Sequence, residues 1–195
     1  MDAIRRFWES FRRLEARLVE EGHDLGVAYD MLLEDVQKIE PGLFLEICPE
    51  GEPKEFIVTA EGKKELFPIV EEIVRAAPKM DGWKFLALKP RLGFPVKIQW
   101  EAVEVRIKDV TFKPIPHPDR TLSLELFVKN LRPEDAEDAH NALLRALDHG
   151  LGERAFAEQI QGTQVAPTPG WLRAAGLIPL TELEGYLRKR STSSR

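Results

Sequence analysis

The sequence is poor in the residue types that build disulfide-linked and metal-bound scaffolds. Its 195 residues include one cysteine, Cys48, and four histidines. A single cysteine excludes an internal disulfide and a cysteine-based zinc site. No two histidines stand at the spacing of a known metal motif. We therefore expect a protein with no metal, no cofactor and a reducing, cytoplasmic location.

Long apolar runs are missing as well. No stretch approaches the ~18 consecutive apolar residues of a membrane-spanning helix, and residues 1–22 carry charges throughout, unlike a secretory signal. The net charge is −5 and the sequence pI is about 5.5, which gives no overall electrostatic attraction to nucleic acid. With 43% hydrophobic and 31% charged residues, the composition is typical of a soluble protein with an apolar core.

Hydrophobic periodicity predicts an α+β fold. Apolar residues recur at helical spacing over 3–21 and 24–38, which predicts an N-terminal helical hairpin. Residues 54–88 and 121–165 each follow the order strand, helix, strand, and the second unit ends in a predicted strand over 154–165. We therefore predict a mostly antiparallel sheet with the two long helices of these units packed on one face.

No low-complexity linker interrupts these elements, so the sequence favours a single domain over residues 1–195. Alternating residues also predict two antiparallel strand pairs, 43–48 with 56–60 and 96–100 with 103–107. The predicted parts are a helical hairpin (1–40), a first sheet and helix unit (41–112), a second such unit (113–166) and a tail with a short helix (167–195). The likeness of the two units rests on pattern and leaves open whether a duplication produced them.

The loop over 113–120 holds the histidine with the most catalytic potential. His117 lies in the sequence Pro-His-Pro-Asp-Arg, where Asp119 could orient its imidazole and Arg120 stands beside it. Glu46 or Arg91 would complete an enzymatic site in a cleft. The prolines on both sides of His117 fit a rigid strand connection equally well, so the sequence leaves enzymatic activity open.

Residues that could contact a partner are fewer and more scattered. The candidates are Trp8, Glu46, Trp83, Arg91 and Trp100. Exposed tryptophans would mark a partner surface, whereas buried ones would close the ends of the core. Glu46 is a single charge inside an apolar strand, so it lies on a solvated face or lines a groove.

Basic residues concentrate at the two ends of the chain. They are Arg5, Arg6, Arg12, Arg13 and Arg17 in the first predicted helix, and Arg188, Lys189, Arg190 and Arg195 at the C-terminus. Acidic residues between the helical arginines favour ion pairs on a solvated face. Weak nucleic-acid binding through these two segments is the alternative.

Several segments together carry a resemblance. They are PGLFLEI at 41–47, EFIVTAEG at 55–62, FPIVEEIVRAAP at 67–78, GWKFLALKPR at 82–91, LGE at 151–153 and GLIPLTEL at 176–183. The chain resembles a group of uncharacterised bacterial proteins with an ISADG strand-turn, a helix ending in AAP and a GW strand. It departs from that form at 58–61, which read Val-Thr-Ala-Glu. The resemblance implies a small cytoplasmic bacterial protein and transfers no catalytic residue.

The sequence as a whole favours a non-enzymatic protein-binding or adaptor protein, such as a chaperone-like or immunity-like partner of another protein. Catalytic motifs are missing, and the exposed edge of a sheet can accept a second chain by strand addition. A homodimer is compatible with the same pattern. The competing hypotheses are an enzyme with its site around the 113–120 loop and weak nucleic-acid binding.

Overall fold

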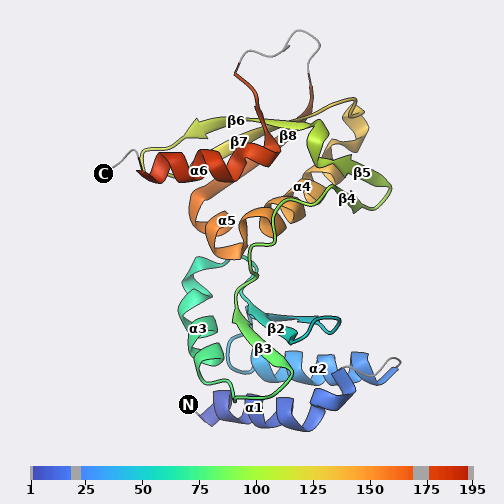
Figure 1. The fold of residues 1–195 in the computed structure, drawn as a ribbon, viewed down its shortest axis with the longest axis vertical. Helices are drawn as coiled ribbons and strands as arrows, with labels where there is room; N and C mark the ends of the chain where they lie inside the picture. Colours follow the sequence, from blue (N-terminus) through green and yellow to red (C-terminus); the bar gives the residue numbers. More distant parts are fainter. Residues whose placement is uncertain (1, 19–22, 169–175, 193–195) are drawn as a thin grey trace. The chain divides into compact units, whose positions relative to one another are not determined.

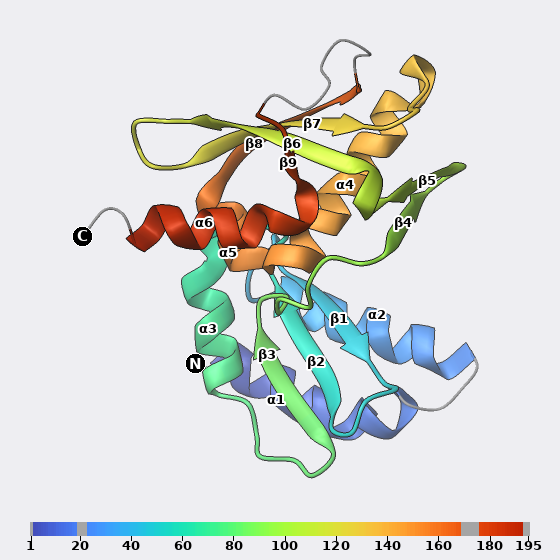
Figure 2. The same cartoon turned by 45° about the horizontal axis from the view of Figure 1, so that its top comes forward.

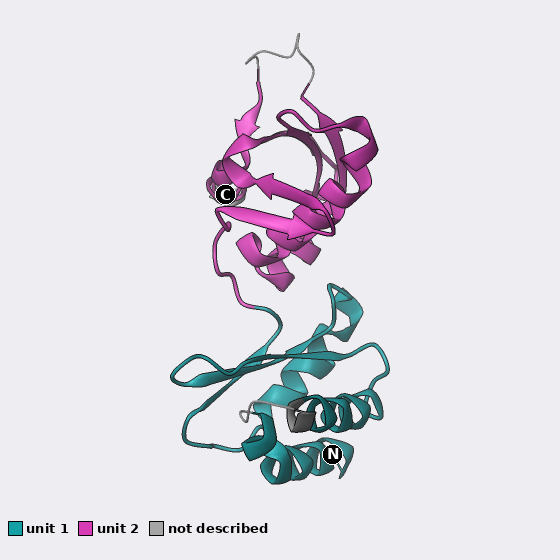
Figure 3. Cartoon of the chain, turned by 90° about the vertical axis from the view of Figure 1, so that its right-hand side faces the viewer, with its two compact units in different colours: residues 1–89 teal, residues 90–195 magenta. Residues whose placement is uncertain are grey.

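The computed structural model describes residues 2–18, 23–168 and 176–192. The chain divides into two compact units, residues 1–89 and residues 90–195 (Figure 3). Each unit has β-structure and buried apolar residues of its own. Each is therefore described by itself, as unit 1 and unit 2.

Unit 1 combines a three-stranded sheet with three α-helices in its described part (Figure 1). The helices are α1 (Asp2–Leu14), α2 (His23–Gln37) and α3 (Phe67–Arg75), with 3-10 helices at Glu15–Leu18 and Lys64–Leu66; the strands are β1 (Phe44–Cys48), β2 (Lys54–Thr59) and β3 (Trp83–Ala87). β1 and β2 pair antiparallel, and β2 and β3 pair parallel. Parallel neighbours need a crossover connection, which α3 supplies.

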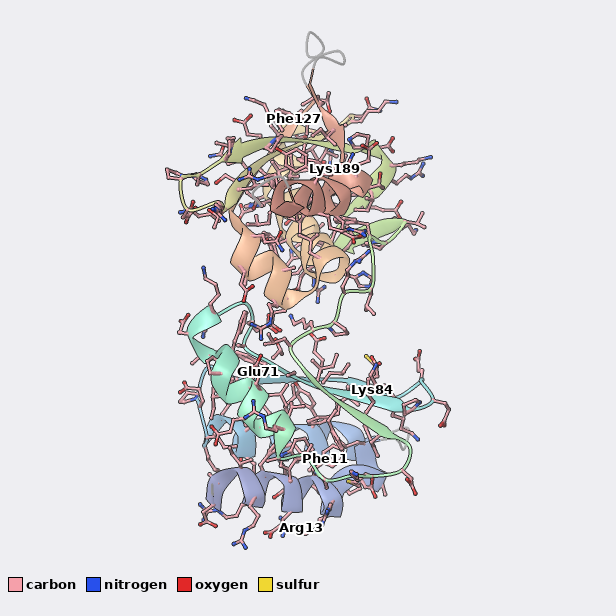
Figure 4. The ribbon with its side chains drawn as sticks, turned by 60° about the vertical axis from the view of Figure 1, so that its left-hand side comes forward. Phe11, Arg13, Glu71, Lys84, Phe127 and Lys189 are labelled. Atoms are coloured by element: carbon pink, nitrogen blue, oxygen red, sulfur yellow. The ribbon has the colours of Figure 1, made fainter. Side chains whose placement is uncertain are left out.

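Aromatic rings fill the space between α1 and the sheet of unit 1. Apolar residues at spacings of three and four put Trp8 and Phe11 on the buried face of α1. They meet Phe56 of β2 and Phe85 of β3, which are neighbours in the sheet register. Ring centroids lie 4.7 Å apart for both Phe11–Phe56 and Trp8–Phe85, edge to face. Figure 4 shows Phe11 on the sheet side of α1 and Arg13 on its outer side.

Unit 2 contains a four-stranded sheet, a two-stranded hairpin and three described α-helices. The strands are β4 (Lys97–Trp100), β5 (Val103–Arg106), β6 (Val110–Pro116), β7 (Leu122–Val128), β8 (Ile160–Pro167) and β9 (Ile178–Pro179); the helices are α4 (Ala136–Leu151), α5 (Glu153–Gln159) and α6 (Leu183–Thr192), with 3-10 helices at Ile107–Asp109, Pro133–Asp135 and Leu180–Glu182. The sheet order is β8-β7-β6-β9. Figures 1 and 2 show α4 and α6 on the same side of this sheet.

Strand β7 organises the core of unit 2. Its residues alternate strictly between buried and half-buried, with Leu122, Leu124, Leu126 and Val128 inward. These pack with the apolar face of α4 and with Leu180, Leu183 and Leu187 from the C-terminal segment. Because successive side chains of a strand point to opposite faces, Ser123, Glu125 and Phe127 lie on the other face, where Figure 4 shows Phe127.

The predicted α+β class is confirmed, and most strand pairs are antiparallel. The parallel pairs are β2–β3 and β7–β8, one in each predicted strand-helix-strand unit. Both predicted antiparallel pairs are present. The β-structure forms three sheets instead of one, however. Helices α3 and α4 therefore cover separate sheets and do not share a face.

Two further elements differ from the sequence prediction. The predicted strand over 154–165 begins only at Ile160, because Glu153–Gln159 forms helix α5. Ala, Glu, Gln and Arg dominate that segment, and they are strong helix formers. The hairpin β4–β5, expected with the first unit, packs in unit 2, where Val105 and Trp100 join the cluster around α4. The single domain over residues 1–195 stays a prediction, because it depends on whether the two units unfold together.

Gly152 joins α4 to α5 in a conformation that only glycine adopts easily. Its φ is +79°, and a Cβ built there would lie 2.9 Å from the backbone nitrogen of Arg91. We expect Gly152→Ala to lower the free energy of unfolding by about 1–3 kcal/mol, since both the backbone and the contact are unfavourable. Chemical denaturation followed by circular dichroism measures the change.

The matched control is Gly185→Ala, at an exposed position in the first turn of α6. A Cβ there meets no atom within 4 Å, so the alanine should stabilise the helix by roughly 0.5–1 kcal/mol. Equal effects of the two substitutions would contradict the role assigned to Gly152.

Candidate functional site

A surface groove lies between α1 and the C-terminal end of α3 in unit 1. Its volume is about 700 Å³. The apolar part of its lining consists of Ile4, Trp8, Ala76 and Pro78. The remaining lining is charged and consists of Arg5, Glu9, Arg12, Glu72 and Arg75. The groove is therefore an apolar depression with charged groups of both signs around it.

One buried hydrogen bond fixes the two sides of the groove. The indole Nε1 of Trp8 donates to the backbone carbonyl of Ile73 at 2.9 Å. Ile73 lies in the last turn of α3, and its carbonyl accepts a second hydrogen bond there, from the backbone N–H of Ala76 at 3.2 Å. Trp8 is only 4% exposed, so its N–H needs this acceptor. Trp8 was predicted as a contact residue, and the structure places it mainly in the core, with an edge in the groove.

The charges around the groove are not balanced by the described residues of unit 1. Arg5 forms ion pairs with Asp2 at 3.3 Å and with Glu9 at 3.8 Å. Arg12 and Arg75 form no ion pair with any residue that the structure describes, and the same holds for Glu72. Within that part of the chain, two unpaired guanidinium groups therefore stand against one unpaired carboxylate. Arginine and tryptophan are the residue types most enriched at binding hot spots.

Glu46 belongs to a different polar cluster of unit 1. Lys89 Nζ lies 3.3 Å from Glu46 Oε1 and 3.0 Å from Glu61 Oε1, and the Lys89 side chain is only 16% exposed. Tyr29 donates from its hydroxyl to the carbonyl of Leu45 at 2.9 Å. Burial, with smaller contributions from Glu46 and other carboxylates, raises the pKa of Tyr29. The cluster is internally paired, so Glu46 is neither isolated nor part of the groove.

The other predicted contact residues are also engaged in packing or pairing. Trp83 lies edge-on to Phe11 at 5.1 Å. Trp100 lies under the Arg145 guanidinium, with 5.1 Å between Arg145 Cζ and the ring centroid. Arg91 forms an ion pair with Glu184. Their role in contacts with a partner stays a prediction.

The predicted catalytic loop over 113–120 is shorter than expected, because residues 113–116 belong to β6 and only residues 117–121 connect β6 to β7. His117 Nε2 lies 2.8 Å from Ser123 Oγ, a residue that the sequence analysis did not select. Asp119 instead accepts from the backbone N–H and the hydroxyl of Thr121, at 3.0 and 2.7 Å. These two bonds, with a smaller effect of His117, lower the pKa of Asp119. Arg120 has φ of +71° at the turn.

The His117 imidazole and the Ser123 hydroxyl are thus adjacent, but the Asp119 carboxylate accepts its hydrogen bonds from Thr121. β6 and β7 pair with Ile115 opposite Ser123. His117 is two residues beyond Ile115 and so lies on the same face, diagonal to Ser123. Among the described residues, no group of histidine, cysteine and acidic side chains could hold a metal ion. Arg91 has an ion-pair partner of its own, Glu184, and no hydrogen bond or ion pair joins it to His117 in the described part of the chain. Glu46 belongs to unit 1, where Lys89 is its ion-pair partner.

The sequence did not predict that Arg12 and Arg75 line one groove. They are 63 positions apart in number, and only the packing of α1 on α3 brings them into one lining. The signal available in the sequence was that Arg12 follows Trp8 by one helical turn. Nothing in the sequence indicated Arg75.

No protein-family model, curated protein or solved structure matches the chain. The resemblance drawn from the sequence therefore stays a prediction, and function has to be argued from geometry. In the part of the chain that the structure describes, no helix has the length and apolar character needed to cross a membrane.

The Trp8 hydrogen bond gives a direct stability test. Trp8→Phe keeps an aromatic ring but removes the donor to Ile73. We expect the free energy of unfolding to fall by about 1–3 kcal/mol, from the lost bond and a small cavity. The control is Trp83→Phe, because the Trp83 indole has no hydrogen-bond partner among the described residues. Urea denaturation should show a clearly smaller loss of unfolding free energy for Trp83→Phe. Equal losses for the two variants would contradict the stabilising role of the Trp8 hydrogen bond.

The role of Asp119 can be tested by its titration. Thr121→Val removes the hydroxyl that is the largest cause of the lowered pKa of Asp119. We therefore expect this pKa to rise towards its ordinary value, and His117→Ala to raise it less. Carboxyl ¹³C chemical shifts measured against pH give both values. A larger effect of His117→Ala would mean that Asp119 serves the imidazole, as a catalytic relay requires.

Proposed function

We propose that this protein is a non-enzymatic protein-binding or adaptor protein of a bacterial cytoplasm. Its groove between α1 and α3 is proposed to receive a segment of another protein. The observation that carries the proposal is the apolar lining with Arg12 and Arg75 left without ion pairs among the described residues. Chaperone-like and immunity-like proteins are examples of this class of partner.

The chemistry of the lining defines the segment that would fit. Ile4, Trp8 and Pro78 offer apolar contact, which favours aliphatic or aromatic side chains on the partner. Guanidinium groups pair with carboxylates in a planar, bidentate geometry. The partner segment is therefore acidic, with carboxylates opposite Arg12 and Arg75 and an apolar face towards Trp8.

An amphipathic helix meets these requirements most simply. Helix-in-groove recognition uses apolar anchors three, four and seven residues apart on one face. Acidic side chains on the flanks of such a helix would reach the charged margins of the groove. The lining here comes from one helix and the end of another, and Arg5, Arg12, Arg75 and Ala76 are exposed. Small-molecule sites enclose most of their ligand, so this open lining favours a protein segment.

An enzyme is the second candidate, supported by the 2.8 Å contact between His117 and Ser123. A base beside a hydroxyl is the core of nucleophilic catalysis. The titration of Asp119 described above bears on this alternative, because it shows whether the carboxylate is coupled to the imidazole.

Nucleic-acid binding is supported less by the described residues. Arg5 and Arg6 pair with acidic residues of the same helix, and Arg188 pairs with Glu184. Charges neutralised in this way are less available to phosphates, whose binding would be steeply salt-dependent.

The charge of the groove gives a test that can be made before any partner is identified. The full chain and its Arg12→Glu, Arg75→Glu double variant would each be used to select from a phage library of helical peptides. We expect the unmodified protein to select peptides that combine aliphatic and acidic residues. The double variant, whose lining retains Glu9 and Glu72, should select lysine and arginine instead.

The matched control carries the same charge change away from the groove, as Lys64→Glu with Lys108→Glu. Both lysines are exposed and neither lines the groove. This variant should select the same acidic peptides as the unmodified protein. Failure to select any peptide, or selection of the same peptides by the groove variant, would refute the proposal. Thermal unfolding of all variants checks that the fold is retained.

A further inference from the structure

Strand β8 of unit 2 is a long edge strand without charged residues. It spans Ile160–Pro167, the longest strand described, and pairs only with β7 in the sheet order β8-β7-β6-β9. Its sequence, IQGTQVAP, contains no charged residue, and its single proline is the last residue. Exposed strand edges invite pairing with another chain, and proteins normally protect them with charge, proline, a β-bulge or short length. The register of β8 shifts at its start, where Ile160 faces Leu122 and Gly162 faces Ser123, so the regular part of the edge is residues 162–167.

The other described edge strands of this protein carry such protection. β1 contains Glu46 and β3 contains Lys84. The hairpin strands β4 and β5 contain Lys97, Glu104 and Arg106. At the opposite edge of the same sheet, β9 is two residues long and ends in proline. Among the described edge strands, a long strand without charged residues is therefore specific to β8.

The outer side of β8 is also free of backbone partners after Ile160 in the described part of the chain. Its ladder to β7 accounts for the inner side. At its first residue the Ile160 N–H donates to the carbonyl of Phe156 at the end of α5. No backbone hydrogen bond beyond the β7 ladder is made to residues 161–167 by the parts of the chain that the structure describes. The six regular residues of this edge, 162–167, span roughly 20 Å at about 3.3 Å per residue, enough for several backbone hydrogen bonds to an added strand.

We propose that β8 pairs with β8 of a second copy of this chain. Two identical strands related by a two-fold axis perpendicular to the sheet run antiparallel, and the two sheets become one continuous sheet. In a two-fold interface each residue faces its own copy or a near neighbour. A charged strand would then oppose like charges, which is destabilising. The absence of charge from β8 removes that obstacle.

The residues of β8 suit such self-pairing. With the axis beside Gln164, its amide side chain meets that of its own copy across the axis, and Gln161 and Gln164 are both exposed. On the face of the sheet away from α4, the ion pair of Lys113 with Glu125 lies in the same row as Gln164. The row would continue across the interface through Gln164. This pairing of β8 does not depend on the groove of unit 1.

Sedimentation velocity of the full chain over a concentration series tests the proposal. The unmodified protein should show a reversible monomer–dimer equilibrium. Gln164→Lys and Gln164→Glu should each weaken association, roughly fivefold or more, since like charges then meet at the axis. An equimolar mixture of the two variants should restore the dimer, because the opposed charges become complementary.

The control is Gln99→Lys, the same substitution at an exposed glutamine of β4. It should leave the equilibrium unchanged, and circular dichroism should show all variants folded. A monomer at every concentration, or a dimer that persists in both Gln164 variants, overturns the proposal. Binding of a different protein at this edge without a dimer overturns it as well. None of these results bears on peptide selection by the groove, so the two proposals fail independently.

Discussion

One hydrogen bond positions the two sides of the groove in unit 1. The buried indole of Trp8 needs an acceptor, and the carbonyl of Ile73 lies in the last turn of α3. The carbonyl, which also accepts the N–H of Ala76, supplies that acceptor and ties α1 to the end of α3. The aromatic cluster behind Trp8 and the spacing between Arg12 and Arg75 both depend on that contact.

The contacts proposed for the two units rely on different kinds of interaction. The groove of unit 1 offers side chains, so its selectivity comes from the charge and shape of a partner segment. The β8 edge of unit 2 offers backbone groups, which pair with any extended strand, so its selectivity comes from what is excluded. An uncharged edge offers no counter-charge to a charged strand. It therefore favours a partner strand that is also uncharged. The same strand of a second copy meets that condition.

Sequence patterns predicted the elements far better than their arrangement. The strict alternation of residues 122–128 and the helical spacing on α1 depend on near neighbours, and both are present. Helix α5 was missed because a short segment of helix formers precedes a real strand. The division into three sheets, the contact of His117 with Ser123 and the pairing of Arg12 with Arg75 in one groove arise from distant segments. A single sequence carries no local signal for such contacts.

The ammonium of Lys89 has a practical consequence for dividing the chain. Lys89 is the last residue of unit 1 and is followed by Pro90, where composition alone suggests a dispensable connection. Its ammonium is the shared ion-pair partner of Glu46 and Glu61, and the backbone N–H of the neighbouring Leu88 donates to the carbonyl of Val58. A recombinant fragment that stopped at Ala87 would leave two adjacent carboxylates without a counter-charge and free the end of β3. The natural cutting point for expressing unit 1 therefore lies after Lys89.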